Sequence, residues 1–252
     1  MSLADQLREL VTPFAAHQVG LVVSHGDQII LSWQANQVFP AASLIKLAIL
    51  NQTLSQHPDL EAPIALDTTP VVGGAGVLQL MPSVTHLPLK TVLELMLAVS
   101  DNYAANLMLA RSSMTAINEW LIDHGDVNTK LQRYLMDTKS VKKGLDNVTT
   151  AQDAWQLFRT ALTDYPETQA WFAHQQFRYK LPATIDELET PITVLNKTGE
   201  GPAVDHDVAR FFIGTDYYDV ALLTADIADR SQAILLHQRV GQCIAQTLLS
   251  NL

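Results

Sequence analysis

Cysteine and clustered metal ligands are scarce in this sequence. The only cysteine among the 252 residues is Cys243, which excludes an internal disulfide. It lies in an apolar stretch near the C-terminus, where a cysteine is more often a small buried side chain than a nucleophile. The eight histidines are scattered, and no His-Glu-x-x-His sequence or His/Cys pair has the spacing of metal ligands. We therefore expect no metal site and no cofactor.

Basic residues and long apolar runs are scarce as well. Sixteen lysines and arginines stand against 26 acidic residues, a formal net charge of −10, which argues against nucleic acid as a partner. No apolar run approaches the length of a membrane span, so we expect no membrane insertion. The first residues lack the regions of a signal peptide, which predicts a cytoplasmic protein, or a secreted one if a leader has been removed. We expect a monomer.

Hydrophobic residues, in contrast, make up 48% of the chain, enough for one large globular domain. Periodicity predicts a helix at 3–16, a β-hairpin from 19–23 and 29–33, and a closing helix at about 229–250. Three more strands precede that helix, at 193–197, 209–215 and 218–224. The middle of the chain is predicted to be helical, at 43–56, 88–99, 102–111, 115–124, 149–163 and 166–178.

This order of elements predicts an α+β fold. Strands from both chain ends would form one antiparallel sheet, flanked by the terminal helices, and the helical middle would form a second, all-α lobe. We expect a single domain over 1–252. Its α/β lobe would span about 1–42 and 190–252, and its all-α lobe about 43–189.

Three short strings carry most of the chemistry, and the first is Ser43-Leu44-Ile45-Lys46, which opens an apolar helix. A serine there receives the positive end of the helix dipole, and its backbone N–H has no partner within the helix. Lys46 shares a helix face with Ser43. In a dry site burial penalises the ammonium, so a neutral lysine can accept the serine proton. Alone, the pattern is more often a capping serine with a surface lysine.

The second string, Ser100-Asp101-Asn102, joins two apolar helices. One interpretation is a helix cap, which is common at such junctions. In the other, the Ser100 hydroxyl relays protons in a cleft, and Asn102 holds a substrate amide or orients the lysine.

The third string, Lys197-Thr198-Gly199, ends an apolar strand. Lys197 and Thr198 can attract a carboxylate, and the small Gly199 permits a close approach. The next N–H, that of Glu200, can point with the N–H of Ser43 at a developing oxyanion. A plain strand end before a turn at Gly199-Glu200-Gly201-Pro202 is the alternative.

In this order and in these contexts, the three strings resemble the serine β-lactamase and penicillin-binding protein superfamily, above all the class A β-lactamases. The resemblance covers essentially the whole chain. It implies these roles: nucleophile Ser43, its base Lys46, proton shuttle Ser100, amide-binding Asn102, carboxylate-binding Lys197 and Thr198 beside Gly199, and an oxyanion hole from the N–H groups of Ser43 and Glu200.

The loop between the second and third strings departs from that family. Class A enzymes carry an E-x-x-L-N sequence there, whose glutamate activates the deacylating water, whereas residues 131–150 contain no glutamate. Asp137 is the closest acid by position and Asp146 the second. A base misplaced by about 1 Å can cost on the order of a hundredfold in rate, and aspartate is one methylene shorter than glutamate. Asp137 is thus a candidate catalytic base, or a loop acid paired with Arg133 or Lys139.

Two further segments attract attention. Asp205-His206-Asp207 is predicted to form a turn into the next strand or to line the cleft. Gly73-Gly74-Ala75-Gly76 lacks the glycine spacing of nucleotide-binding loops and is predicted to be a mobile loop over the cleft.

The sequence therefore predicts a serine hydrolase similar to class A β-lactamases, which opens a β-lactam or a related amide or ester through a Ser43 acyl-enzyme. The expected partner is a small-molecule β-lactam or a peptidoglycan-like substrate. Two alternatives remain: a D-alanyl-D-alanine peptidase or small esterase, and a penicillin-binding sensor or trap that turns over slowly. A glutaminase-like amidohydrolase shares S-x-x-K but would not explain the other two strings.

Overall fold

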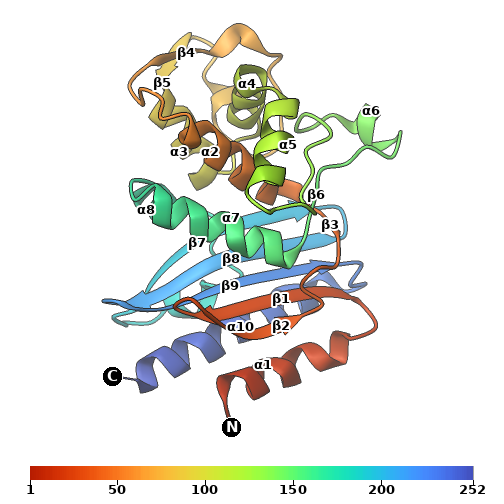
Figure 1. Cartoon of the computed structure of the whole chain (residues 1–252), viewed down its shortest axis with the longest axis vertical. Coiled ribbons are helices and arrows are strands. Elements are labelled where there is room, and N and C mark those ends of the chain that lie inside the picture. Colours follow the sequence, from red (N-terminus) through yellow and green to blue (C-terminus); the bar gives the residue numbers. More distant parts are fainter. Residues whose placement is uncertain (252) are drawn as a thin grey trace.

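A five-stranded antiparallel sheet, in the order β2-β1-β9-β8-β7, forms the centre of one lobe (Figure 1). The structure is a computed structural model that describes residues 1–251. Two strands come from the start of the chain and three from its end: β1 (Gln18–His25), β2 (Gln28–Trp33), β7 (Thr193–Gly201), β8 (Val204–Ile213) and β9 (Asp216–Ala225). The two chain ends meet where β1 pairs with β9. The predicted α+β fold is confirmed.

Helices cover both faces of this sheet (Figure 1). The terminal helices α1 (Leu3–Val11) and α10 (Arg230–Ser250) lie on one face, and α7 (Ala151–Asp164) lies on the other. Successive side chains of a strand point to opposite faces. Leu21 accordingly joins the core beneath α1 and α10, while its neighbour Val22 joins the core of the other lobe. Burial on both faces explains why β1 reads as a continuous apolar run.

The second lobe is helical and surrounds α2 (Ile45–Ser55), whose residues from Ile45 to Leu54 are all buried. A helix that is buried all round belongs to a core. Its neighbours are α3 (Leu89–Ala98), α4 (Asn102–Ser112), α5 (Met114–Asp123) and α7, and α8 (Thr168–Ala173) packs against α3. The shorter elements are β3 (Phe39–Pro40), β4 (Pro63–Ala65), β5 (His86–Pro88), β6 (Val148–Thr149), α6 (Thr138–Val141), α9 (Ala183–Asp186), and 3₁₀ turns at Thr12–Phe14, Ala42–Leu44, Leu66–Thr68 and Leu78–Leu80.

The prediction for the end of the sheet was wrong in two places. The strand predicted at 193–197 continues to Gly201 in β7, and β8 begins at Val204 rather than at 209, so the turn considered as an alternative at 199–202 lies later. Asp205-His206-Asp207 is therefore part of β8, and all three side chains are buried. These three polar residues interrupt the apolar pattern of β8, so the start of the strand could not be recognised from the sequence. They tolerate burial because they are hydrogen-bonded, as Asp207 is by Asn196 Nδ2 at 3.0 Å.

Among residues 1–251, no helix combines the length and apolar character needed to cross a membrane.

Helix α10 approaches the chain before α9 at Gly241. A Cβ at Gly241 would lie 2.0 Å from the backbone oxygen of Leu181. We expect Gly241→Ala to lower the free energy of unfolding by about 1–3 kcal/mol, because backbone must move, a loss that exceeds the gain of at most about 1 kcal/mol from better helix propensity. Urea denaturation measures it. Gln246→Ala, at an exposed position of the same helix, is the control; equal stability of the two variants would contradict the clash.

Candidate active site

Ser43 lies in the 3₁₀ turn that leads into α2, at the junction of the two lobes. Its side chain is partly exposed and lines a cleft of about 860 Å³. The turn packs against strand β7, since a Cβ at Gly199 would lie 3.1 Å from Leu44 and 3.3 Å from the carbonyl oxygen of Ala41. A glycine in β7 therefore allows the strand to approach the serine closely.

Lys46 is fully buried beneath Ser43, and its Nζ contacts four oxygen atoms. Ser43 Oγ lies at 3.0 Å and Asn102 Oδ1 at 2.9 Å, while the carbonyl and hydroxyl oxygens of Ser100 lie at 2.6 and 3.1 Å. Burial, and then the charge of Lys197, hold the pKa of Lys46 well below its usual value.

These four contacts fit a neutral amine. The carbonyl of Ser100 and the amide oxygen of Asn102 only accept, so they take the two N–H groups of a neutral Lys46. The nitrogen lone pair is then free to accept from a hydroxyl, and Ser43 Oγ lies within reach. The site can therefore remove the proton of Ser43 without a metal or a histidine.

Ser100 connects this lysine to a second one. Its Oγ lies 3.1 Å from Lys46 Nζ and 3.0 Å from Lys197 Nζ. Its backbone has a φ of +53°, a left-handed conformation that is unfavourable for a non-glycine residue. Two hydrogen bonds hold the backbone in this conformation. Lys46 donates to the Ser100 carbonyl, and the Asp101 N–H donates to the carbonyl of Leu95. Together they place one hydroxyl between two amines.

Asp101 and Asn102 hold the glycine-containing loop at the cleft. Asp101 caps α4 through the N–H of Ala104, and its other oxygen accepts from the N–H groups of Val77 and Leu78, at 2.6 and 2.9 Å. The Asn102 N–H donates to Ala75, and its Nδ2 donates to Gly73. The loop lies at the cleft as predicted, but it is anchored by these bonds, which speak against the mobility expected of it.

Lys197 and Thr198 come from the middle of β7. Lys197 is fully buried and donates to Ser100 Oγ and to the carbonyl of Thr198, at 3.0 and 2.8 Å. Burial lowers the pKa of Lys197 to about 7, against the opposing influence of Asp207 and Glu200. Thr198 and Glu200 line the cleft. β7 is an edge strand, so one of its sides has no paired strand and faces the cleft.

The structure thus brings together nearly all the residues predicted from the sequence. Lys46 and Lys197 reach the cleft from below, through their contacts with Ser43 and Ser100. Five of the predicted site residues line the cleft directly: Ser43, Ser100, Asn102, Thr198 and Glu200. Among residues 1–251, no group of three side chains suited to a metal ion occurs.

Asp137 stands apart from this cluster. It caps the short helix α6: one carboxylate oxygen accepts from the N–H groups of Lys139 and Ser140, and the other accepts the Ser140 hydroxyl at 2.6 Å. These hydrogen bonds, first that of the Ser140 hydroxyl, lower the pKa of Asp137. The catalytic role of Asp137 stays a prediction. The contacts found here are those of a cap and oppose proton uptake.

Asp146 and Leu135 are among the loop residues that line the cleft. Asp146 Oδ1 accepts from Arg133 Nε at 2.7 Å. Leu135 is buried, with 6% of its surface exposed. Its backbone is fixed by Asn106, which accepts from the Leu135 N–H at 2.8 Å and donates to its carbonyl at 3.1 Å. Leu135 was not singled out from the sequence, because an apolar residue in a loop indicates packing rather than chemistry.

Comparison with known proteins gives the family. A family profile described as "Beta-lactamase enzyme family" matches residues 2–248. A search of curated proteins found no significant match.

Solved structures share the fold. A β-lactamase from Sphaerobacter thermophilus superposes with a TM-score of 0.83 at 21% identity, covering 98% of this chain and 97% of its own. PBP-A superposes with a TM-score of 0.81 at 22% identity, covering 99% of this chain and 96% of its own. A representative of class A β-lactamase from Bacteroides cellulosilyticus gives 0.81 at 17%, covering 99% of both chains. With the profile matching nearly its full length, the chain belongs to the β-lactamase enzyme family.

Proposed function

We propose that this protein is a serine hydrolase that opens a β-lactam, or a related amide or ester, through an acyl-enzyme on Ser43. One observation carries the proposal: Ser43 Oγ lies 3.0 Å from a fully buried Lys46 whose pKa burial has lowered. A nucleophile in contact with a neutral base can attack a carbonyl at neutral pH.

Acylation then follows from the contacts. Lys46 takes the proton of Ser43, and Oγ forms a bond to the carbonyl carbon, so that the carbonyl oxygen becomes negative. The N–H groups of Ser43 and Glu200 stabilise that oxyanion. As the C–N or C–O bond breaks, Ser100 gives its proton to the leaving atom and regains one from Lys46, which lies 3.1 Å away. Lys46 returns to the neutral form, and an ester of Ser43 remains.

Substrate recognition is assigned to the rim of the same cleft. Lys197 and Thr198 bind a carboxylate, Gly199 lets it come close, and Asn102 holds an amide. Apolar residues of the loop, of the segment after α8 and of the start of β8 also line the cleft: Leu135, Met136, Val141, Phe177 and Val204. The proposed substrate is therefore a small amide or lactam with an apolar acyl group and a carboxylate.

The loop favours a second candidate, a penicillin-binding protein that acylates but releases the product slowly. Residues 131–150 contain no glutamate, Asp137 is engaged as a cap, and Leu135 occupies the buried wall. A variant of the structural neighbour PBP-A is known as an acyl-enzyme complex with penicillin G. A D-alanyl-D-alanine peptidase or small esterase shares the acylation step and remains the other alternative.

One experiment separates these functions. The protein is incubated with a chromogenic cephalosporin and with a fluorescent penicillin, and turnover and intact mass are followed. Steady turnover that Ser43→Ala removes supports a β-lactamase. A lasting adduct on Ser43 with little turnover supports the penicillin-binding protein or the peptidase. If the protein shows no adduct and no turnover, β-lactam recognition is refuted.

Acylation by carboxylate-bearing β-lactams should depend on pH through Lys197. Below its pKa of about 7 the lysine is positive and attracts the carboxylate; above it the charge is lost. The second-order acylation rate constant, which reports the free enzyme, is expected to fall as the pH rises through 7. An uncharged ester acylating the same serine is the comparison, and an equal fall for both substrates would contradict the assignment.

A further inference from the structure

A fully buried lysine, Lys180, lies beneath the end of the β7–β8 pair. Its Nζ lies 3.3 Å from the carbonyl oxygen of Gly199 in β7 and 3.3 Å from that of His206 in β8. Gly199 and His206 are directly opposite in the register of the two strands. One ammonium group therefore bridges both strands, on the sheet face that α10 covers.

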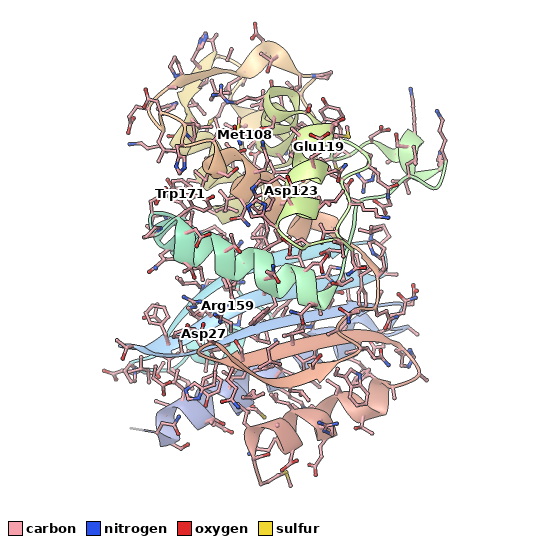
Figure 2. All side chains as sticks on the ribbon, in the orientation of Figure 1. Asp27, Met108, Glu119, Asp123, Arg159 and Trp171 are labelled. Atoms are coloured by element: carbon pink, nitrogen blue, oxygen red, sulfur yellow. The ribbon has the colours of Figure 1, made fainter. Side chains whose placement is uncertain are left out.

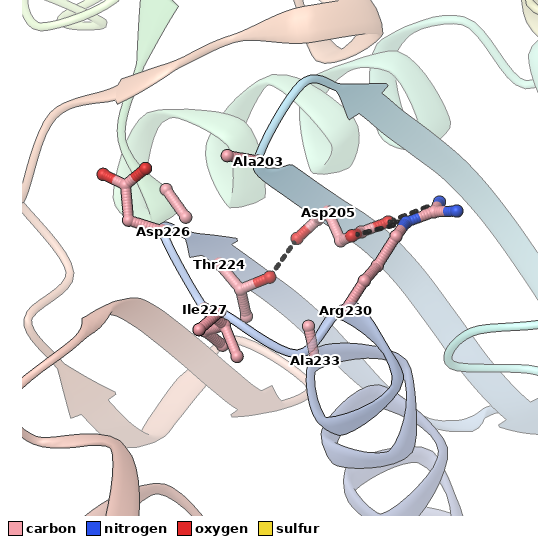
Figure 3. Close-up of a pocket in the computed structure, with 9 residues that line it drawn as sticks. Ala203, Asp205, Thr224, Asp226, Ile227, Arg230 and Ala233 are labelled. Atoms are coloured by element: carbon pink, nitrogen blue, oxygen red, sulfur yellow. Dashed lines mark hydrogen bonds and ion pairs between the residues drawn. The ribbon is translucent and has the colours of Figure 1, made fainter.

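Ion pairs hold this ammonium in place. Asp205 Oδ1 lies 3.1 Å from Lys180 Nζ, and a carboxylate oxygen of Glu200 lies at 3.7 Å. Arg230, at the start of α10, pairs with both acids, at 2.9 Å from Asp205 and 3.2 Å from Glu200. Figure 3 shows the Arg230 side chain meeting Asp205 at the end of the strand. The four side chains form a closed set of two cations and two anions.

The backbone that carries Lys180 is fixed as well. The next residue, Leu181, donates its N–H to Asp207 Oδ2 at 3.1 Å, and its carbonyl lies against Gly241 of α10. Lys180 is thus clamped between the sheet and the C-terminal helix. It cannot move away without disturbing that helix.

The hydrogen bond from Lys180 to the carbonyl of Gly199 acts on the proposed oxyanion hole through a single peptide group, the one that joins Gly199 to Glu200. The carbonyl of Gly199 and the N–H of Glu200 are the two ends of the same planar trans peptide and point in opposite directions. A cation bound to the carbonyl end fixes the direction of the N–H end. It also polarises the peptide, which strengthens the N–H as a donor, because hydrogen bonds to charged groups are stronger and bonds in series reinforce one another.

We propose that Lys180 is a positioning residue of the oxyanion hole, which holds and polarises the Gly199–Glu200 peptide from behind the β7 strand. The inference rests on the proposed function, since it concerns the N–H assigned to the oxyanion. Lys180 touches no substrate in this arrangement. The neighbouring ion pairs with Asp205 and Glu200 hold its side chain against the strand.

The test compares Lys180→Met with the wild-type enzyme in its reaction with fluorescent penicillin. Removing an oxyanion donor outright typically costs 10²–10³-fold, so we expect the loss of its support to lower the acylation rate constant by about ten- to a hundredfold. The dissociation constant of the pre-covalent complex should stay unchanged. The amide resonance of Glu200 should shift more than those of the rest of β7, measured by NMR in the substrate-free protein.

Two further variants separate positioning from stability. Lys180→Met with Asp205→Asn removes cation and anion together, which restores the charge balance and hence stability; acylation should remain low. Arg159→Met removes a cation that pairs with Asp27 and Asp219 at the far end of the sheet (Figure 2). It should lower stability and leave acylation unchanged.

Acylation within twofold of wild type in either folded Lys180 variant, or an unmoved Glu200 amide, would overturn the proposal. Recovery of acylation together with stability in the double variant would also overturn it, because the role would then be structural only. A wild-type protein that forms no adduct would refute the proposed function instead, and the Glu200 resonance would still decide whether Lys180 acts on this peptide.

Discussion

Lys46→Met is expected to acylate at least 10²-fold, and up to about 10⁴-fold, more slowly than the wild-type protein. Methionine fills the space of the buried side chain but has no lone pair to take the proton of Ser43, 3.0 Å away. The rate constant for labelling by fluorescent penicillin measures the effect. Lys46→Arg should be equally slow, because a guanidinium keeps its proton.

Lys46→Met is expected to fold but to melt at a lower temperature than the wild type. Methionine removes the donors to the carbonyl of Ser100 and to Asn102 Oδ1, and a buried acceptor left without a partner costs about 1–3 kcal/mol. Circular dichroism should therefore show a folded variant at the assay temperature before acylation is compared. Lys90→Met, at an exposed lysine paired with Glu61, is the matched control and should acylate normally. Acylation by Lys46→Met within tenfold of the control would exclude Lys46 as the base.

Leu135→Glu is expected to turn a slow acyl-enzyme into a faster hydrolase. Leu135 lies in the wall of the cleft, and Asn106 fixes its backbone from both sides, so a new carboxylate would be held in place. Partial burial would raise its pKa towards neutrality, as a general base requires. We expect the adduct on Ser43 to disappear about 10²-fold faster, the lower end of what a positioned base contributes.

Intact-mass spectrometry after removal of excess penicillin measures the loss of the adduct. Leu135→Gln is the control: glutamine has nearly the same shape as glutamate but no carboxylate to act as a base. Its adduct should therefore persist as in the wild type. Asp137→Asn tests the other acid and should leave deacylation unchanged, because the Asp137 carboxylate serves as a cap. If Asp137→Asn slows deacylation while Leu135→Glu has no effect, Asp137 is the base.

Local patterns predicted part of the geometry of the candidate site. Ser43 and Lys46 share a helical turn, so their contact follows from spacing alone, and Ser100-Asp101-Asn102 was recognisable as a helix junction. The contacts across the cleft did not follow from spacing. Lys197 lies 97 positions from Ser100, and only the meeting of the two lobes places its amine on that hydroxyl. The resemblance to known enzymes assigned both residues to one site, with separate roles, but did not predict this contact.

Residues that act through tertiary contacts could not be recognised from local patterns. Lys180 stands in a mixed polar segment and reads as a surface lysine, yet it is fully buried. Asp205 and Asp207 interrupt the apolar pattern of β8, so the strand was predicted to begin too late. In each case the buried polar side chain has ion-pair or hydrogen-bond partners elsewhere in the fold, and a local pattern contains no information about those partners.

The pairing of β1 with β9 also governs how the chain acquires its fold. Residue Leu21 must meet Leu222, which closes a loop of about 200 residues. The entropy of closing a long loop is lost before its contacts form, and such topologies fold slowly. On the ribosome, β1 and β2 emerge first and wait, with an unpaired edge, until the last strands are synthesised. Refolding should therefore be slow and prone to aggregation, and chaperones that shield strand edges should raise the yield.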